Sequence, residues 1–341
     1  MNSSDRIRWI DIAKGVAILS VILGHTFMFG NPVHAFVYSF HIPLFFIVSG
    51  YLAKPKKVDI KKLSKRLLCP YFAICFSTTC LSLISQSISG SWVRRMLGAV
   101  IWASGGDIDE LGIPGIGLAW FLMAMYVARL FHSYTLSFFE KRGIAEHYRF
   151  LYFFGALMLG WGLSKLIVLP FSLEQGLIAS FYIYMGSLVR KLDEHVGPAL
   201  RMCLCLLALG IWIISLQMGC FYSIGNLFHV RSLAMGILMS LSSSYFVLQL
   251  CELVDDFFSA SVALDYLARV GECSLTVLCI HWIEASFIQW GVMSANANLS
   301  MSLAIGLQHI ALVLGIYLVI ACSFPAASVV YSQSSSKRSD S

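Results

Sequence analysis

The chain has 341 residues, of which 58% are hydrophobic and only 12% charged, and its mean hydropathy is +0.77. Soluble domains carry about a quarter charged residues, so this composition excludes a soluble globule, and it also excludes a disordered chain and a disulfide scaffold. The net charge of +6 is distributed in short basic clusters between apolar runs, which is typical of membrane orientation and not of a nucleic-acid surface. The sequence therefore predicts a polytopic, all-α membrane protein.

About ten apolar runs have the roughly 20 residues that crossing a bilayer requires. We expect these spans near residues 10–29, 36–53, 67–89, 117–136, 150–169, 175–190, 200–217, 228–250, 271–290 and 302–323. With a cytoplasmic N-terminus, the cytoplasmic segments collect 19 Lys and Arg and the outer segments collect four. Because positive charge is enriched in cytoplasmic loops, this split predicts about ten helices with both termini in the cytoplasm.

No fixed-period repeat and no appended soluble domain are evident in the sequence. We expect one integral membrane domain over residues 1–331 and a polar, disordered cytoplasmic tail over 332–341.

The first run contains three titratable residues, Asp11, Lys14 and His25. At about 100° per residue they fall on one stripe of a helix, with His25 roughly 16 Å beyond Lys14 along the axis. Titratable side chains inside a span are costly and are functional candidates. Two interpretations stay open: an interfacial Asp11–Lys14 pair with His25 capping the helix, or a histidine that acts as general base toward a hydroxyl group.

The second run reads FHIPLFFIVSGYLAK and contains His41, Pro43, Ser49 and Gly50. An early proline tolerates a local break in a span, and a Ser-Gly pair lets neighbouring backbones approach closely. Ser49 and Gly50 can therefore serve helix packing or a site. His41, near the outer end, can orient an acceptor or face water.

Seven Lys and Arg follow between positions 54 and 66. Orientation and attraction to anionic lipid explain most of them. Lys65 and Arg66 differ, because they open the third run directly before Pro70, where cations can bind a phosphorylated ligand from the cytoplasm.

The outer connection 90–116 begins with SWVRRMLGAVIWAS, which predicts an amphipathic helix on the membrane, and continues as a Gly/Pro-rich loop. Trp120 and Arg129 follow in the fourth run. In the ninth run, His281 and Glu284 are three residues apart and face the same way, so the carboxylate can fix the histidine tautomer or simply form an interfacial pair.

The ten cysteines lie mostly inside apolar runs and form no CxxC pair, so we expect no structural zinc and no metal cofactor. They are interpreted as small buried apolar residues.

Several of these pieces resemble one known family. RIRWIDIAKGVAILSVILGH, FHIPLFFIVSGYL, KRLLCPYF, AWFL and, more weakly, GECSLTVLCIHW are similar in order to the acyltransferase-3 family of integral membrane acyltransferases, especially its bacterial sugar O-acetyltransferase branch. In this family a basic residue is followed, after ten intervening residues, by a histidine. Lys14 and His25 match this pattern. Its pair of basic residues three apart is matched only in part, since Arg66 fits the second position and Leu63 stands at the first, with Lys62 beside it.

The resemblance implies transfer of an acyl group, usually acetyl from acetyl-CoA, to a hydroxyl of a cell-envelope polysaccharide or its lipid-linked sugar precursor. It implies a multi-pass protein of the bacterial inner membrane, with acyl-CoA, a glycan acceptor and the bilayer as partners and no nucleic acid. The roles expected from it are catalysis by His25 with Asp11, and CoA binding by Lys14, Lys65 and Arg66. Acceptor binding is expected at His41, Ser49, Trp120, His281 and Glu284.

A transporter or flippase of a glycan intermediate is the main alternative, with the polar stripe of the first run lining its pathway. A non-catalytic membrane scaffold is a third, and it predicts that His25 can be replaced freely.

Overall fold

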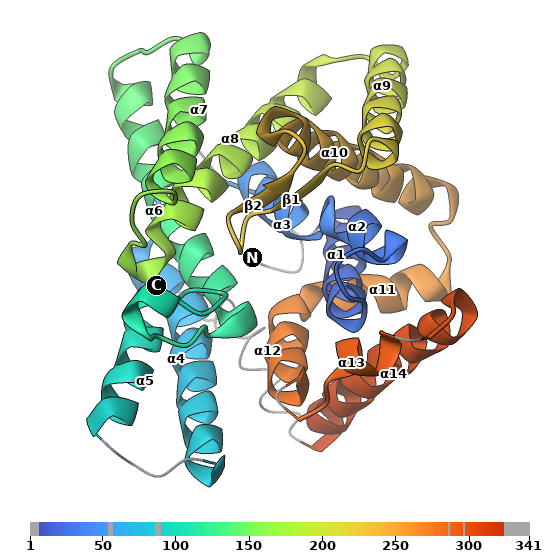
Figure 1. Ribbon diagram of the computed structural model, residues 1–341. Helices are drawn as coiled ribbons and strands as arrows, with labels where there is room; N and C mark the ends of the chain where they lie inside the picture. Colours follow the sequence, from blue (N-terminus) through green and yellow to red (C-terminus); the bar gives the residue numbers. More distant parts are fainter. Residues whose placement is uncertain (1–6, 54–56, 86–89, 286, 296, 324–341) are drawn as a thin grey trace, which may run out of the picture. The chain divides into compact units, whose positions relative to one another are not determined.

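The computed structural model describes residues 7–53, 57–85, 90–285, 287–295 and 297–323, so the expected tail over 332–341 lies outside the described residues. Helices dominate the described chain (Figure 1), which confirms the all-α class. Within the described ranges, the one sheet is a two-stranded antiparallel hairpin of β1 (Phe221–Ser223) and β2 (Phe228–Val230).

The chain forms two compact units. The first unit joins both ends of the sequence, residues up to Val37 and from Val247 onward, and the second unit is Tyr38–Phe246. The helices of the first unit are α1 (Arg8–Thr26), most of α2 (Pro32–Tyr38), the end of α10 (Leu233–Phe257), α11 (Val262–Glu272), α12 (Ser274–Ala285), α13 (Trp290–Ser294) and α14 (Leu299–Ser323). Those of the second unit include α3 (His41–Tyr51), α4 (Ile60–Ser85), α5 (Gly90–Trp102), α6 (Trp120–Lys141), α7 (Glu146–Leu163), α8 (Leu173–His195) and α9 (Pro198–Gln217).

Five helical segments of the described chain are long and apolar enough to cross a membrane: Arg8–Thr26, Pro32–Tyr51, Pro198–Gln217, Leu233–Phe257 and Ser300–Ser323. Helices α4, α6, α7 and α8 also fall where spans are expected. With 26, 22, 18 and 23 residues they have the necessary length but are less apolar or more charged. The molecule is therefore a helical membrane protein, while the count of ten spans and the side of each terminus stay predictions.

The second expected span, 36–53, is not one continuous helix but breaks between α2 and α3. Pro43 has no N–H to donate to the carbonyl of Ser39, four residues earlier, so that carbonyl loses its helical partner. The Ser243 hydroxyl donates to it at 3.0 Å, and Trp212 donates to the Ser39 hydroxyl at 2.9 Å. Side chains of α9 and α10 thus provide hydrogen-bond partners for the polar groups of Ser39 at the break that the proline permits.

The span expected near 228–250 is present as the helix Leu233–Phe257, and its start is shifted because the run begins with strand β2. A further expectation is corrected. The run 271–290 contains the 12-residue helix α12, which rises roughly 18 Å and is too short to cross a hydrocarbon core of about 30 Å by itself. The amphipathic helix expected over 91–104 is confirmed as α5, whereas its position on a membrane stays a prediction.

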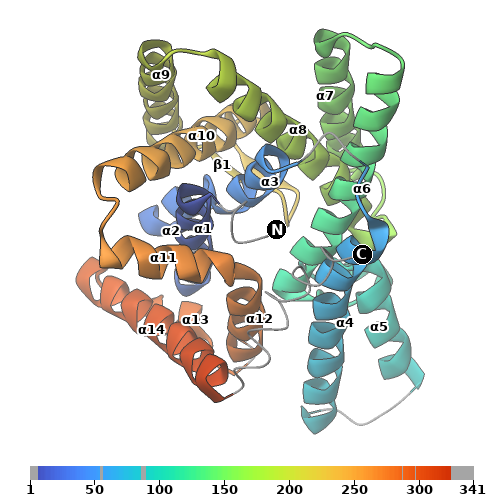
Figure 2. The same cartoon turned by 180° about the vertical axis from the view of Figure 1, so that it is seen from behind.

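Close backbone contacts between helices depend on reciprocal glycines, as the Ser-Gly pair of the second run suggested. In the second unit, a Cβ on Gly50 would lie 1.7 Å from the carbonyl oxygen of Ile183, and one on Gly186 would lie 1.9 Å from that of Ile47. Helices α3 and α8 therefore cross with their backbones in contact, as both views show (Figures 1 and 2).

The first unit repeats this device where α11 crosses α1. A Cβ on Gly15 would lie 2.3 Å from the carbonyl oxygen of Leu267, and one on Gly271 would lie 1.8 Å from that of Asp11. The polar end of α1 is thereby held directly against α11.

Candidate active site

His25 lies in the last turn of α1 and is exposed, whereas its neighbour Thr26 is fully buried. The His25 ring lies 5.5 Å, centre to centre, from the ring of His281 on α12. His281 is completely buried. The structure thus places an accessible imidazole against an enclosed one.

His281 also belongs to a buried polar cluster, which it forms with Glu284 of α12 and His309 of α14. Glu284 Oε2 lies 3.0 Å from His309 Nε2 and 3.6 Å from His281 Nδ1. One nitrogen of each histidine and a Glu284 oxygen all lie within 4.8 Å of one another. The expectation that His281 and Glu284 face the same way is confirmed.

The cluster is also connected to the end of α1. His309 Nδ1 lies 2.8 Å from the Thr26 hydroxyl, and the Ser294 hydroxyl donates to the Thr26 carbonyl. The indole of Trp290 stacks on the His309 ring with 4.4 Å between centres and an interplanar angle of 11°. Helices α12, α13 and α14 together therefore fix the turn that presents His25.

At the other end of α1, Asp11 and Lys14 form an ion pair, as one of the two sequence interpretations had it. Asp11 is buried and Lys14 is partly buried. Arg8, one turn earlier, pairs with Asp255 of α10 and with Asp265 of α11, the latter at 2.8 Å. The basic end of α1 is thus fixed by carboxylates on three helices of the first unit.

The other sequence candidates belong to the second unit. Arg129 on α6 donates to the Ser49 hydroxyl at 2.7 Å and to the Ser49 carbonyl at 3.3 Å. Arg190 on α8 donates to the carbonyl of Ala53 at 2.6 Å, just past the end of α3. The Ser49 hydroxyl therefore already has a charged donor, which gives it a role in joining α3 to α6.

His41 and Trp120 are both buried by packing. The His41 ring meets Tyr38 edge to face at 4.6 Å between centres. A Cβ on Gly105 or Gly225 would lie 2.8 or 2.7 Å from the indole of Trp120, so this ring fills a space that two glycines leave. These contacts explain why both residues are buried without invoking a ligand.

Lys65 and Arg66 are exposed near the beginning of α4, while Leu63 beside them is buried. Their side chains are accessible to an anionic ligand, as the sequence interpretation requires. They belong to a different unit from His25 and Lys14, so a shared CoA site stays a prediction.

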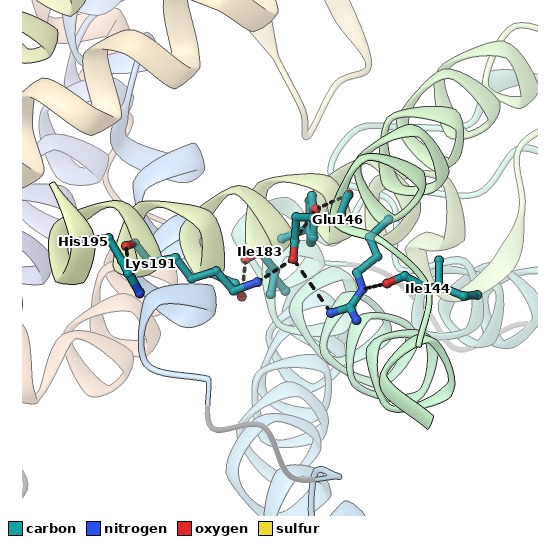
Figure 3. Close-up of polar contacts among 8 residues, drawn as sticks. Ile144, Glu146, Ile183, Lys191 and His195 are labelled. Atoms are coloured by element: carbon teal, nitrogen blue, oxygen red, sulfur yellow. Dashed lines mark hydrogen bonds and ion pairs between the residues drawn. The ribbon is translucent and has the colours of Figure 1, made fainter. Parts of the chain in front are cut away.

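A second polar cluster joins α7 to α8 and involves no residue that the sequence singled out (Figure 3). Glu146 accepts from Lys191 Nζ at 2.6 Å and from the Tyr184 hydroxyl at 2.7 Å, and Arg149 lies 3.9 Å away. Partial burial opposes ionisation, but the Lys191 and Tyr184 hydrogen bonds and the nearby cations lower the pKa of Glu146 below its ordinary value. Both segments are expected on the cytoplasmic side, and that placement stays a prediction.

Of the ten predicted site residues, the structure assembles two groups in the first unit: His25, His281 and Glu284, and separately Asp11 and Lys14. The sequence interpretation missed His309. It is a single histidine inside the apolar run 302–323, and a titratable residue at such a depth was the available signal.

The fold and this site define an integral membrane protein with a buried histidine–carboxylate cluster beside an exposed histidine. The comparison with protein families then identifies the family: residues 7–330, nearly the whole chain, match the model described as an acyltransferase domain, that of the acyltransferase-3 family. The chain belongs to this family and is a membrane acyltransferase. No curated protein and no solved structure matches it.

Proposed function

We propose that the protein transfers an acetyl group from acetyl-CoA to a hydroxyl of a cell-envelope polysaccharide or its sugar precursor, in the inner membrane of a bacterium. The observation that supports this most directly is the exposed His25 beside a buried cluster, in a chain whose family is that of membrane acyltransferases.

In this proposal His25 is the general base. The acceptor oxygen attacks the thioester carbonyl and forms the new C–O bond, its proton passes to the His25 imidazole, and the C–S bond breaks to release CoA. The proton on His25 then returns to the CoA thiolate, so the enzyme regenerates without a further reactant. A histidine is suited to this role because its pKa lies near physiological pH.

Lys14, Lys65 and Arg66 are proposed to bind the phosphates of CoA, and Asp11 to position Lys14 through their ion pair. His41, Ser49, Trp120, His281 and Glu284 are proposed to line the path of the acceptor. Ser49 would act there through the Arg129 guanidinium that its hydroxyl accepts from.

The test is the O-acetyl content of envelope glycans, measured by NMR in a strain that lacks the gene and is complemented with single variants. Wild type should restore the O-acetyl signal. The signal restored by His25→Ala should be lower by at least about 100-fold, as expected for loss of a general base. His147→Ala, which changes an exposed histidine of α7 outside the site, is the matched control and should restore it fully.

All three proteins must reach the membrane in equal amounts. Full restoration by His25→Ala would overturn the assignment of the base. A strain that loses glycan export but keeps acetylation would favour the transporter instead.

A further inference from the structure

The buried cluster of His281, Glu284 and His309 has the composition of a metal-ligand set. Two imidazoles and one carboxylate are the three protein ligands of many catalytic zinc sites and of related iron sites. His281 and His309 are 0% exposed and Glu284 is 5% exposed. Sequence spacing predicted no metal, because Glu284 and His309 lie 25 positions apart on separate helices and only folding brings them together.

The contacts around His309 fix the orientation of its ring. The Thr26 hydroxyl donates to the carbonyl of Ile22 at 3.0 Å, and its oxygen lies 2.8 Å from His309 Nδ1. In the tautomer with the proton on Nδ1, the ring donates to this oxygen and directs an unprotonated Nε2 at Glu284 Oε2, 3.0 Å away.

Glu284 directs an acceptor oxygen toward both histidines, and His281 Nδ1 lies 3.6 Å from that oxygen. The Trp290 indole donates to Glu284 Oε1 at 2.5 Å, which leaves Oε2 as the oxygen facing the histidines. Neither ring nitrogen of His281 has a hydrogen-bond partner among the described residues. A buried imidazole without a partner is costly, and a bound ligand would remove that cost.

In that tautomer two acceptors face each other 3.0 Å apart and repel unless a proton or a metal ion lies between them. For bonds of about 2.1 Å, neighbouring ligands of an ion are about 3.0–3.4 Å apart. The two separations from Glu284, 3.0 and 3.6 Å, are close to this range, and all three ligand atoms lie within 4.8 Å of one another. The contacts of Thr26 and Trp290 are those that outer partners make with metal ligands, since each fixes the orientation and the lone pair of one ligand.

We propose that His281, Glu284 and His309 bind one divalent transition-metal ion of the zinc class. Three protein ligands leave a further coordination position open for water or an oxygen ligand. His281 is the ligand whose ring lies 5.5 Å from the exposed His25 ring, so the ion would lie near the proposed base. The proposal does not depend on the acyltransfer reaction, because binding is measured without turnover.

The experiment uses the full-length protein in detergent, stripped with a chelator and then loaded with ZnCl₂ or CoCl₂. Wild type should take up about one ion per chain, and the loaded protein should melt at a higher temperature than the stripped one. Glu284→Gln and His281→Gln should each lower the affinity at least about tenfold. His132→Gln, a change of a buried histidine on α6, is the matched control and should keep the metal.

X-ray absorption on loaded wild type keeps the proposal falsifiable if the variants do not fold. The expected first shell is nitrogen and oxygen at about 2.0–2.2 Å, whereas sulfur at about 2.3 Å would place the ion on cysteines and overturn the proposal. Uptake below about 0.1 ion per chain by folded wild type would also overturn it, leaving a His309–Glu284 ion pair. Equal uptake by Glu284→Gln would mean an adventitious ion only.

Discussion

The crossing of α3 and α8 leads to a stability prediction whose size can be worked from the structure. In Gly186→Ala the new Cβ would lie 1.9 Å from the carbonyl oxygen of Ile47. An ordinary contact between carbon and a carbonyl oxygen is at least about 3.3 Å, so the two backbones must separate by about 1.4 Å. Because backbone cannot rotate away as a side chain can, we expect the upper part of the usual overpacking cost, about 2–3 kcal/mol.

Alanine also favours the helix over glycine by about 1 kcal/mol, and a matched variant removes this contribution. Gly210→Ala lies in the interior of α9, where a Cβ would meet nothing within 4 Å. The two variants gain the same helix propensity, so their difference isolates the contact with Ile47. Gly186→Ala should be less stable than Gly210→Ala by about 2–3 kcal/mol, or on the order of 5 °C in melting temperature.

The assay can use the protein's own thiols. Cys75, Cys220 and Cys251 are buried and free, so a thiol-reactive fluorescent dye reports their exposure as the detergent-solubilised protein unfolds. Equal melting temperatures for the two alanine variants would refute the reasoning, since they would show that α3 and α8 separate without cost or do not touch.

Three further predictions concern the other contacts. Glu146→Gln should cost about 0.5 kcal/mol at neutral pH because the carboxylate is 43% exposed. Since the folded-state pKa of Glu146 is lowered, the stabilisation by its carboxylate is complete above the ordinary value of 4.5 and is lost as the pH falls through the folded-state pKa. The difference in melting temperature between Glu146→Gln and wild type should therefore be constant near pH 6–7 and shrink below pH 4.5. A constant difference down to pH 3 would contradict this. Ser49→Ala should lower stability by about 1.5–3 kcal/mol in the same dye assay, because the partly buried Arg129 guanidinium loses one of its acceptors, while unchanged stability would show that this hydrogen bond does not stabilise the packing of α3 on α6. Gly271→Ala, with its Cβ 1.8 Å from the carbonyl of Asp11, should displace α11 from α1 and reduce acyl transfer along with thermal stability, and a variant with wild-type activity would show that this crossing does not support the site.

Hydropathy predicted where most helices lie but not how they begin or break. The first span was expected over 10–29 and α1 is Arg8–Thr26, because a long apolar run in this composition has few alternatives to a helix. The break before α3 depends on Ser243, 204 positions from Ser39, and strand β2 lies at the beginning of the run that predicted a span over 228–250. A sliding hydropathy window detects neither the Ser243 hydrogen bond nor the strand pairing.

The residues of the candidate site likewise include some that the sequence predicted and some that it did not. His25, His281 and Glu284 were visible because titratable residues are rare in apolar runs. His309 has no polar neighbour in sequence that would mark it, and its partners Thr26 and Glu284 lie 283 and 25 positions away. The ion pair of Asp11 and Lys14 was foreseeable from an i, i+3 spacing, whereas the carboxylates that hold Arg8 come from residues about 250 positions later.

Because the first unit is made of the two ends of the chain, synthesis order constrains how the site assembles. Helix α1, with Arg8, Asp11 and Lys14, emerges from the ribosome before the other described helices, yet its packing partners α11, α12 and α14 are encoded after residue 261. At about 5–20 residues per second, the intervening residues 38–246 take on the order of 10–40 s to translate. During that interval the nascent α1 lacks its glycine contacts with α11 and Arg8 lacks its acidic partners, so the insertion machinery or the lipid headgroups must accommodate the charged first turns of this apolar helix. His25 becomes part of a cluster only when the last described helix, α14, has been made.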